Sequence, residues 1–79
     1  MQVLLYSRPG CHLCDVARAV IEGERARTSF ELVEVNVESD DALELAYGIR
    51  IPVVLIDGEE RFDVSVDPAA FAAAVGPSL

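Results

Sequence analysis

Two cysteines three positions apart are the residues of this chain whose type and spacing could do chemistry. Cys11 and Cys14 are the only cysteines among 79 residues, and the turn residues Pro9 and Gly10 come directly before them. At positions i and i+3 of a first helical turn, two cysteines lie on one side of the helix, within reach of a disulfide. The spacing therefore predicts thiol–disulfide exchange, in which a thiolate attacks a disulfide sulfur.

The place of each cysteine in the predicted helix suggests a different role for it. Cys11 comes at the helix start, where unpaired backbone N–H groups and the helix dipole favour a thiolate, so it is the expected nucleophile. Cys14 lies one turn further in and is the expected resolving thiol, which attacks Cys11 and releases the reduced substrate. Two residues could support the Cys11 thiolate: Arg8 and a charged His12, although His12 could equally be a solvated loop residue.

Other uses of the cysteine pair have weaker support. A closed structural zinc site takes four ligands, whereas the pair and the single histidine, His12, offer three at most. No metal site within the chain is therefore expected. The alternative to an enzyme is a non-catalytic module: a dimer bridged by a metal or cluster, or a redox-inert interaction domain on the same fold.

The length and composition of the chain indicate how many domains it forms and where in the cell it is expected. With 79 residues, 52% of them apolar, the chain is long enough for one domain with a core and too short for two. No apolar stretch approaches the roughly 20 residues of a membrane span, and the N-terminus lacks the basic segment that begins a signal peptide. A cytoplasmic location is expected, where cysteines are more often reactive or metal-binding than structural.

The charge balance is strongly acidic. The chain has 14 acidic residues, six arginines and no lysine, for a net charge of −8. Without a basic stripe, nucleic acids and anionic membranes are not expected partners. The charge either steers the chain toward a basic protein surface or simply keeps it soluble, and solubility is the commoner reason. We expect a monomer that acts on a protein or low-molecular-weight disulfide and receives electrons from a reductase or from glutathione.

Hydrophobic periodicity predicts seven elements in the order β-α-β-α-β-β-α. The strands are expected at 3–6, 30–37, 51–56 and 60–64, and the helices at 11–25, from about 41 to 47, and at 69–75. Residues 39–41 offer cap oxygens for the second helix, with Glu44 at capping-box distance from Asp41. Asp57-Gly58 is hairpin-turn chemistry, which makes the last two strands antiparallel. Gly76-Pro77 stops the last helix.

This order predicts an α/β domain with a mixed four-stranded sheet and helices on both faces. The first and third strands are nearly continuous apolar runs, as central strands are, and the second alternates with acidic residues, as edge strands do. Cys11 lies at the carboxyl end of the first strand, and in open α/β sheets active sites are commonly found at this edge. The first helix should carry the ion pairs Asp15–Arg18 and Glu22–Arg25. Its other face carries apolar residues at helical spacing: Leu13, Val16, Ala17, Val20 and Ile21.

Two segments resemble known redox proteins. The run from Leu5 to Asp15, with its Cys-His-Leu-Cys motif, is similar to the opening of short bacterial members of the glutaredoxin family. The run from Tyr47 to Glu59 resembles the thioredoxin segment around its cis proline, one residue shorter. The two runs are 11 and 13 residues long and lie in opposite halves of the chain, so the resemblance draws on both halves. The resemblance implies one domain over residues 1–79 with the thioredoxin/glutaredoxin-like fold, and the activity of a dithiol–disulfide oxidoreductase.

The resemblance also assigns roles around Pro52. Base rates favour a trans bond before it, since only about 5–6% of X–Pro bonds are cis. The resemblance implies instead a cis bond with Pro52 facing Cys11, and Ile51 as the residue whose backbone pairs with substrate. It gives Arg8 the place of a basic residue that contacts a glutathione carboxylate in glutaredoxins. The glycine pair that cradles glutathione there is missing from residues 59–65, so no tightly bound cofactor is expected and glutathione binding is left open.

Overall fold

A computed structural model of the chain describes residues 1–76. Its elements are β1 (Gln2–Ser7), α1 (His12–Arg25), β2 (Glu31–Asn36), the 3-10 helix η1 (Val37–Ser39), α2 (Asp41–Tyr47), β3 (Val53–Ile56), β4 (Glu59–Asp63) and α3 (Pro68–Val75). The order of the strands and α-helices is the predicted one, and Gly76 caps α3 as expected. Pro77 lies outside the described residues. No helix in residues 1–76 is long and apolar enough to cross a bilayer.

The four strands form one mixed sheet in the order β2-β1-β3-β4. β1 pairs in parallel with β2 and antiparallel with β3, and β3 and β4 form an antiparallel hairpin. The two apolar strands are therefore central and the acidic β2 is an edge, as their patterns predicted. The hairpin turn places Asp57 and Gly58 at φ 50° and 84°, which glycine and aspartate tolerate well and which match the twist of the flanking strands.

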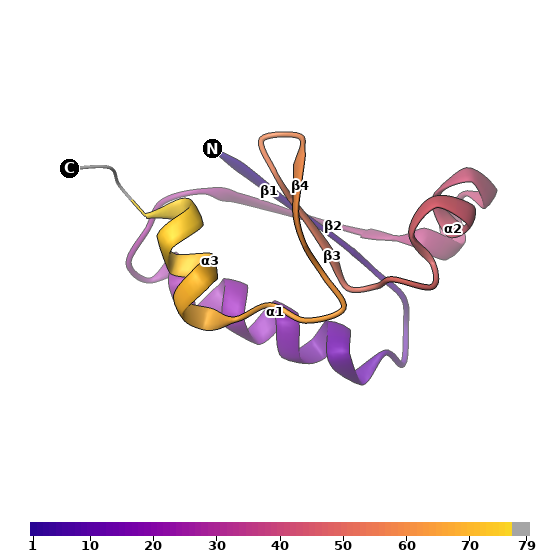
Figure 1. Cartoon of the computed structure of the whole chain (residues 1–79), viewed down its shortest axis with the longest axis horizontal. Coiled ribbons are helices and arrows are strands. Elements are labelled where there is room, and N and C mark those ends of the chain that lie inside the picture. Colours follow the sequence, from indigo (N-terminus) through magenta and orange to yellow (C-terminus); the bar gives the residue numbers. More distant parts are fainter. Residues whose placement is uncertain (77–79) are drawn as a thin grey trace.

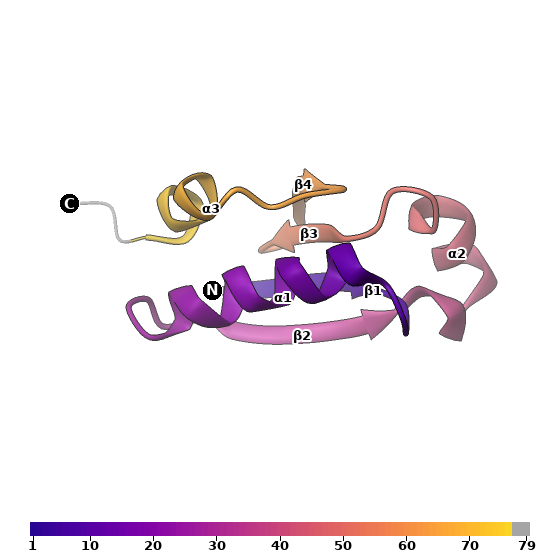
Figure 2. The same cartoon turned by 90° about the horizontal axis from the view of Figure 1, so that it is seen from below.

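The hydrophobic core lies between one face of the sheet and the helices α1 and α3. Leu5 of β1 and Phe71 of α3 are fully buried there, and Figure 1 shows α3 beside α1. Alternate side chains of β1 point to the other face, where Tyr6 stacks on Tyr47 of α2 with ring centroids 4.4 Å apart. Helices thus lie on both faces, and Figure 2 shows α2 at the end of the sheet where β1 and β2 finish.

The apolar stripe predicted for α1 is buried only in part. Ala17 and Ile21 are buried against the sheet, whereas Leu13 and Val16 are each 48% exposed. Periodicity marks one side of a helix but does not show whether a neighbouring element covers it. Leu13 and Val16 follow the predicted helical spacing, yet both lie exposed beside the cysteine pair.

Side-chain caps set where α2 and α3 begin. Asp67 accepts a hydrogen bond from the backbone N–H of Ala70 at 2.9 Å, just before the proline that opens α3. For α2 the cap is Asp40, which accepts from the N–H of Ala42 at 2.7 Å. Because the cap is Asp40 and not Asp41, Glu44 takes no part in a capping box, and its carboxylate pairs elsewhere.

Candidate functional site

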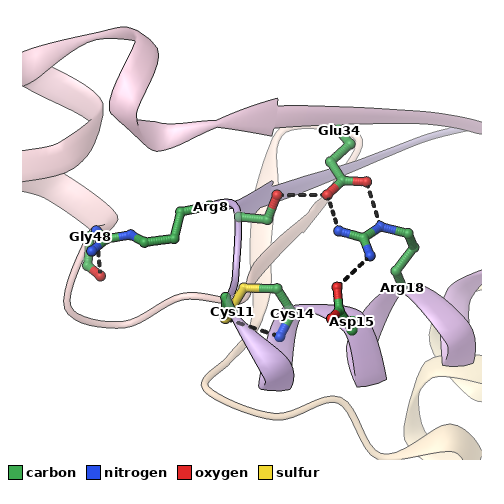
Figure 3. Close-up of a disulfide and its surroundings, with 8 residues drawn as sticks. Arg8, Cys11, Cys14, Asp15, Arg18, Glu34 and Gly48 are labelled. Atoms are coloured by element: carbon green, nitrogen blue, oxygen red, sulfur yellow. Dashed lines mark hydrogen bonds and ion pairs between the residues drawn. A yellow bond between two sulfur atoms is a disulfide. The ribbon is translucent and has the colours of Figure 1, made fainter.

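The cysteine pair begins α1 at the carboxyl end of β1. Cys11 is the N-cap of the helix, with φ −85° and ψ 108°, and Cys14 lies in its first turn. The two sulfurs form a disulfide whose Cα atoms are 5.2 Å apart, so the structure describes the oxidised pair (Figure 3). The spacing of the motif thus places both cysteines on one side of the helix, as predicted.

The two sulfurs differ in their surroundings. Cys14 is fully buried, while Cys11 is half-buried. The Cys11 Sγ accepts a hydrogen bond from the backbone N–H of Cys14 at 3.1 Å. A backbone N–H at a helix N-terminus stabilises negative charge on the atom that accepts its bond. In the reduced protein this bond would favour a thiolate at Cys11, the more accessible of the two sulfurs.

Arg8 and His12, the predicted supporting residues, do not converge on the sulfurs. His12 is exposed at the first position of α1. The Arg8 guanidinium pairs with Glu44 of α2 and donates to the carbonyl oxygen of Gly48 at 3.3 Å. In Figure 3 the Arg8 side chain runs toward Gly48, away from the disulfide. Arg8 therefore ties the cysteine turn to the segment before Pro52, which sequence reasoning missed because Glu44 is 36 residues away.

Pro52 lies at the same edge of the sheet as the cysteine turn. The Ile51–Pro52 bond is cis, as the resemblance implied and against the base-rate expectation. β1 and β3 run antiparallel with Val53 opposite Tyr6, so Pro52 comes next to the end of β1. β3 begins two residues later than predicted, because proline has no N–H to donate to the strand ladder. Pro52 is buried and Ile51 half-buried.

The chain makes a tight turn beside this proline, at Val64. The N–H of Val64 is shared between the carbonyl oxygens of Arg50 and Pro52, at 3.0 and 2.9 Å. The N–H of Ser65 donates back to the carbonyl oxygen of Asp63 at 2.7 Å. Val64 has φ 67°, a left-handed conformation that costs a non-glycine residue about 1–2 kcal/mol. The N–H groups of residues 64 and 65 are thus bonded within the protein.

Replacing Val64 by glycine should stabilise the protein by about 1 kcal/mol. Glycine adopts the left-handed region without a Cβ clash, and we expect this gain to exceed the cost of the greater freedom of glycine in the unfolded chain. Val64→Ala, which keeps a Cβ at the same φ, is the matched control and should gain less. Urea unfolding of the three proteins measures the difference. A glycine variant less stable than the parent would contradict the prediction.

A polar network joins α1 to β2 behind the cysteine turn. Arg18 donates to Glu34 at 2.7 Å and to Asp15 at 2.8 Å. The buried Ser7 hydroxyl donates to the same Glu34 carboxylate at 2.6 Å. The hydrogen bond from Arg18 is the main reason why the pKa of Glu34 lies below its usual range. A cavity of about 440 Å³ opens beside these residues and is not lined by either cysteine. The network holds the first turns of α1 against the sheet edge.

Residues 1–76 contain no group of three or more histidine, cysteine, aspartate or glutamate side chains placed to hold a metal ion. Both cysteine sulfurs are bonded to each other in this state. A bridging metal would therefore need the reduced pair and ligands from a second copy of the chain.

Comparison with known proteins places this geometry in a family. The family described as Glutaredoxin-like domain (DUF836) matches residues 2–75. No curated protein matches the chain. Among solved structures, protein XcR50 from X. campestris is 33% identical over 91% of this chain and 92% of its own, with a TM-score of 0.75. Protein Ne2328 from Nitrosomonas europaea is 26% identical over 95% of this chain and 91% of its own, with a TM-score of 0.80.

A third structure shares the fold at lower identity. The glutaredoxin-like protein NrdH-redoxin from Escherichia coli is 18% identical, covers 100% of both chains and has a TM-score of 0.71. This likeness concerns the fold alone. The family match extends over nearly the whole chain, and both the Cys11–Cys14 pair and the cis Pro52 lie within it. The resemblance is thereby confirmed, and the chain belongs to the glutaredoxin-like family of the thioredoxin superfamily.

Proposed function

We propose that the protein is a dithiol–disulfide oxidoreductase. The observation that carries this proposal is the Cys11–Cys14 disulfide at the N-terminus of α1, with one sulfur half-buried and the other fully buried. A pair in this position can be opened and closed without rearranging the helix, because the cysteines lie in its first turn. Family membership supports the same chemistry.

The exchange proceeds in two displacements. The Cys11 thiolate attacks one sulfur of the substrate disulfide and forms a mixed disulfide, while the other substrate sulfur leaves as a thiolate and takes a proton from solvent. Cys14, as thiolate, then attacks Cys11, which restores the internal disulfide and releases the second substrate thiol. The substrate gains two electrons and the protein dithiol loses two. We assign to the backbone of Ile51, beside Pro52, the pairing with an extended substrate chain.

The expected partners follow from the charge and the fold. We propose a cytoplasmic monomer without a tightly bound cofactor that reduces a protein or low-molecular-weight disulfide and is re-reduced by a reductase or by glutathione. The net charge of −8 supports the expectation that neither nucleic acid nor an anionic membrane is a partner. NrdH-redoxin is described as a glutaredoxin-like protein with a thioredoxin-like activity profile, and we propose the same combination here.

Substituting Cys14 by serine should trap the mixed disulfide. After reaction of the reduced variant with hydroxyethyl disulfide, we expect a stable mercaptoethanol adduct on Cys11, measured by intact-protein mass spectrometry. The wild-type protein should return to its internal disulfide instead. Cys11→Ser is the control. In this variant the buried Cys14 should form the adduct at least about ten times more slowly than Cys11 does in Cys14→Ser.

Two outcomes would count against the proposal. Faster adduct formation in Cys11→Ser than in Cys14→Ser would reverse the two roles. No adduct in either variant, together with no disulfide reduction by the wild type, would overturn the function and favour a non-catalytic module. Native mass spectrometry of untagged protein would then show whether a metal or cluster bridges two copies.

A further inference from the structure

Every arginine of this chain is paired with a carboxylate. All six lie within residues 1–76, and the chain has no lysine. The pairs are Arg8 with Glu44, Arg18 with Asp15 and Glu34, Arg25 with Glu22, Arg27 with Glu24, Arg50 with Glu60 and Asp63, and Arg61 with Glu59. The arginines thus use eight of the 14 acidic residues, and within residues 1–76 the other six are in no ion pair with them.

Half of these unpaired acids lie at the disulfide end of the molecule. Glu38, Asp40 and Asp41 belong to η1 and the start of α2, and all three are exposed. Figure 1 shows α2 at the end of the sheet where β1 runs into the cysteine turn. The Arg8 side chain links the cysteine turn to α2, because it extends from the turn and pairs with Glu44. The solvent at this end therefore faces uncompensated negative charge.

Some of the donors near the disulfide are already engaged, although the buried Nε of Arg8 has no hydrogen-bond partner within residues 1–76. Arg8 is the arginine nearest to the cysteines in the sequence, and its charge is neutralised by Glu44. Beside the proline edge, the N–H groups of Val64 and Ser65 are bonded to carbonyl oxygens. A carboxylate that bound to the Arg8 Nη2 or to these two N–H groups would have to displace a partner, and it would also meet the unpaired acids of residues 38–41.

We propose that Glu44 is a specificity-determining residue: by neutralising Arg8 near the unpaired acids Glu38, Asp40 and Asp41, it makes the disulfide site select substrates in cationic surroundings over anionic ones such as glutathione disulfide. The substrate class is a disulfide flanked by lysine, arginine or amine groups. This selectivity rests on the proposed exchange reaction, and the chemical step is the one given there. What changes with substrate charge is the rate at which the disulfide reaches Cys11.

Three small disulfides of different charge test the selectivity in the wild-type protein. Cystamine is cationic, hydroxyethyl disulfide neutral and glutathione disulfide anionic, and dithiothreitol corrects for their intrinsic reactivity. At low salt, the corrected rate ratio of cystamine to glutathione disulfide should exceed about tenfold. It should fall toward one at high salt, because the Debye length shortens from about 20 Å at 20 mM to about 4 Å at 500 mM.

A matched pair of variants tests the role of Glu44. Glu44→Gln and Glu22→Gln each remove one negative charge and leave one arginine uncompensated. Glu22 lies 11 residues after Cys11, roughly 16 Å along the helix. At 150 mM salt, where the Debye length is about 8 Å, Glu44→Gln should lower the cystamine-to-glutathione ratio about threefold. Glu22→Gln should leave the ratio within error of wild type.

The outcomes separate this inference from the exchange reaction itself. A wild-type ratio equal to that of dithiothreitol at low salt overturns the selectivity while leaving the exchange intact. No reaction with any of the three disulfides overturns the exchange. Equal shifts in the two variants overturn the assignment to Glu44. The wild-type salt dependence decides the selectivity even if Glu44→Gln does not fold.

Discussion

Replacing Cys11 by serine is expected to lower the rate of disulfide reduction by at least about a thousandfold, because a serine hydroxyl stays protonated near neutral pH and cannot replace a thiolate as nucleophile. The fold should survive the change. Serine is a preferred N-cap residue, and its oxygen can accept the N–H of Cys14 that Sγ accepts now. Reduction of insulin coupled to dithiothreitol measures the loss, and circular dichroism checks the helix.

Cys14→Ser is the matched control for this prediction. It keeps the nucleophile and removes the resolving thiol, so its first attack should remain within about tenfold of the wild-type rate. Both variants lose the internal disulfide, which separates loss of the cross-link from loss of the nucleophile. If Cys11→Ser retained more than about a tenth of the wild-type rate, Cys11 would not be the attacking group.

Replacing Phe71 by alanine should lower the free energy of unfolding by about 3–5 kcal/mol. Phe71 is fully buried and lies edge-on to Phe30, with ring centroids 5.9 Å apart, and 6.0 Å from the ring of Phe62. Removal of its ring would leave a cavity in the core between α3 and the sheet. A domain of this size has a total stability of about 4–12 kcal/mol, so the variant should lose at least a quarter of it.

Leu45→Ala on α2 is the control for this effect. Leu45 is 88% exposed, so the same kind of truncation should change the stability by no more than about 0.5 kcal/mol. Urea unfolding measures both variants. Thermal unfolding should show a midpoint for Phe71→Ala lower by about 4–8 °C per kcal/mol. A loss below about 1.5 kcal/mol would contradict the prediction and show that the core repacks around the missing ring.

The elements could be predicted from local patterns because each strand and helix carries its own period and its own stop signals. Asp57-Gly58 predicted the hairpin, and Asp67 before Pro68 predicted the start of α3, since both signals act between neighbouring residues. The features that local patterns could not predict depend on residues far apart in the sequence. Leu13 and Val16 have helical spacing, but no sequence rule shows that their side of α1 remains uncovered.

In the candidate site too, some features could be predicted from the sequence and others depend on contacts formed only in the folded chain. The Cys11–Cys14 pair follows from spacing within one helical turn, and the cis bond at Pro52 follows from resemblance, since base rates pointed to trans. The pairing of Arg8 with Glu44 joins two segments that meet only in the folded chain. The left-handed turn at Val64 escaped prediction because valine is one of the last residues expected at positive φ.

The central position of β1 has a consequence for how the protein is made. β1 is the first strand to leave the ribosome, yet one of its neighbours, β3, ends only at Ile56. Until then β2 is the only strand with which β1 can pair, and one edge of β1 stays open. Pairing over such a separation carries the entropy of closing a long loop. The sheet is therefore completed only after β3 and β4 have been synthesised, well after β1 and β2.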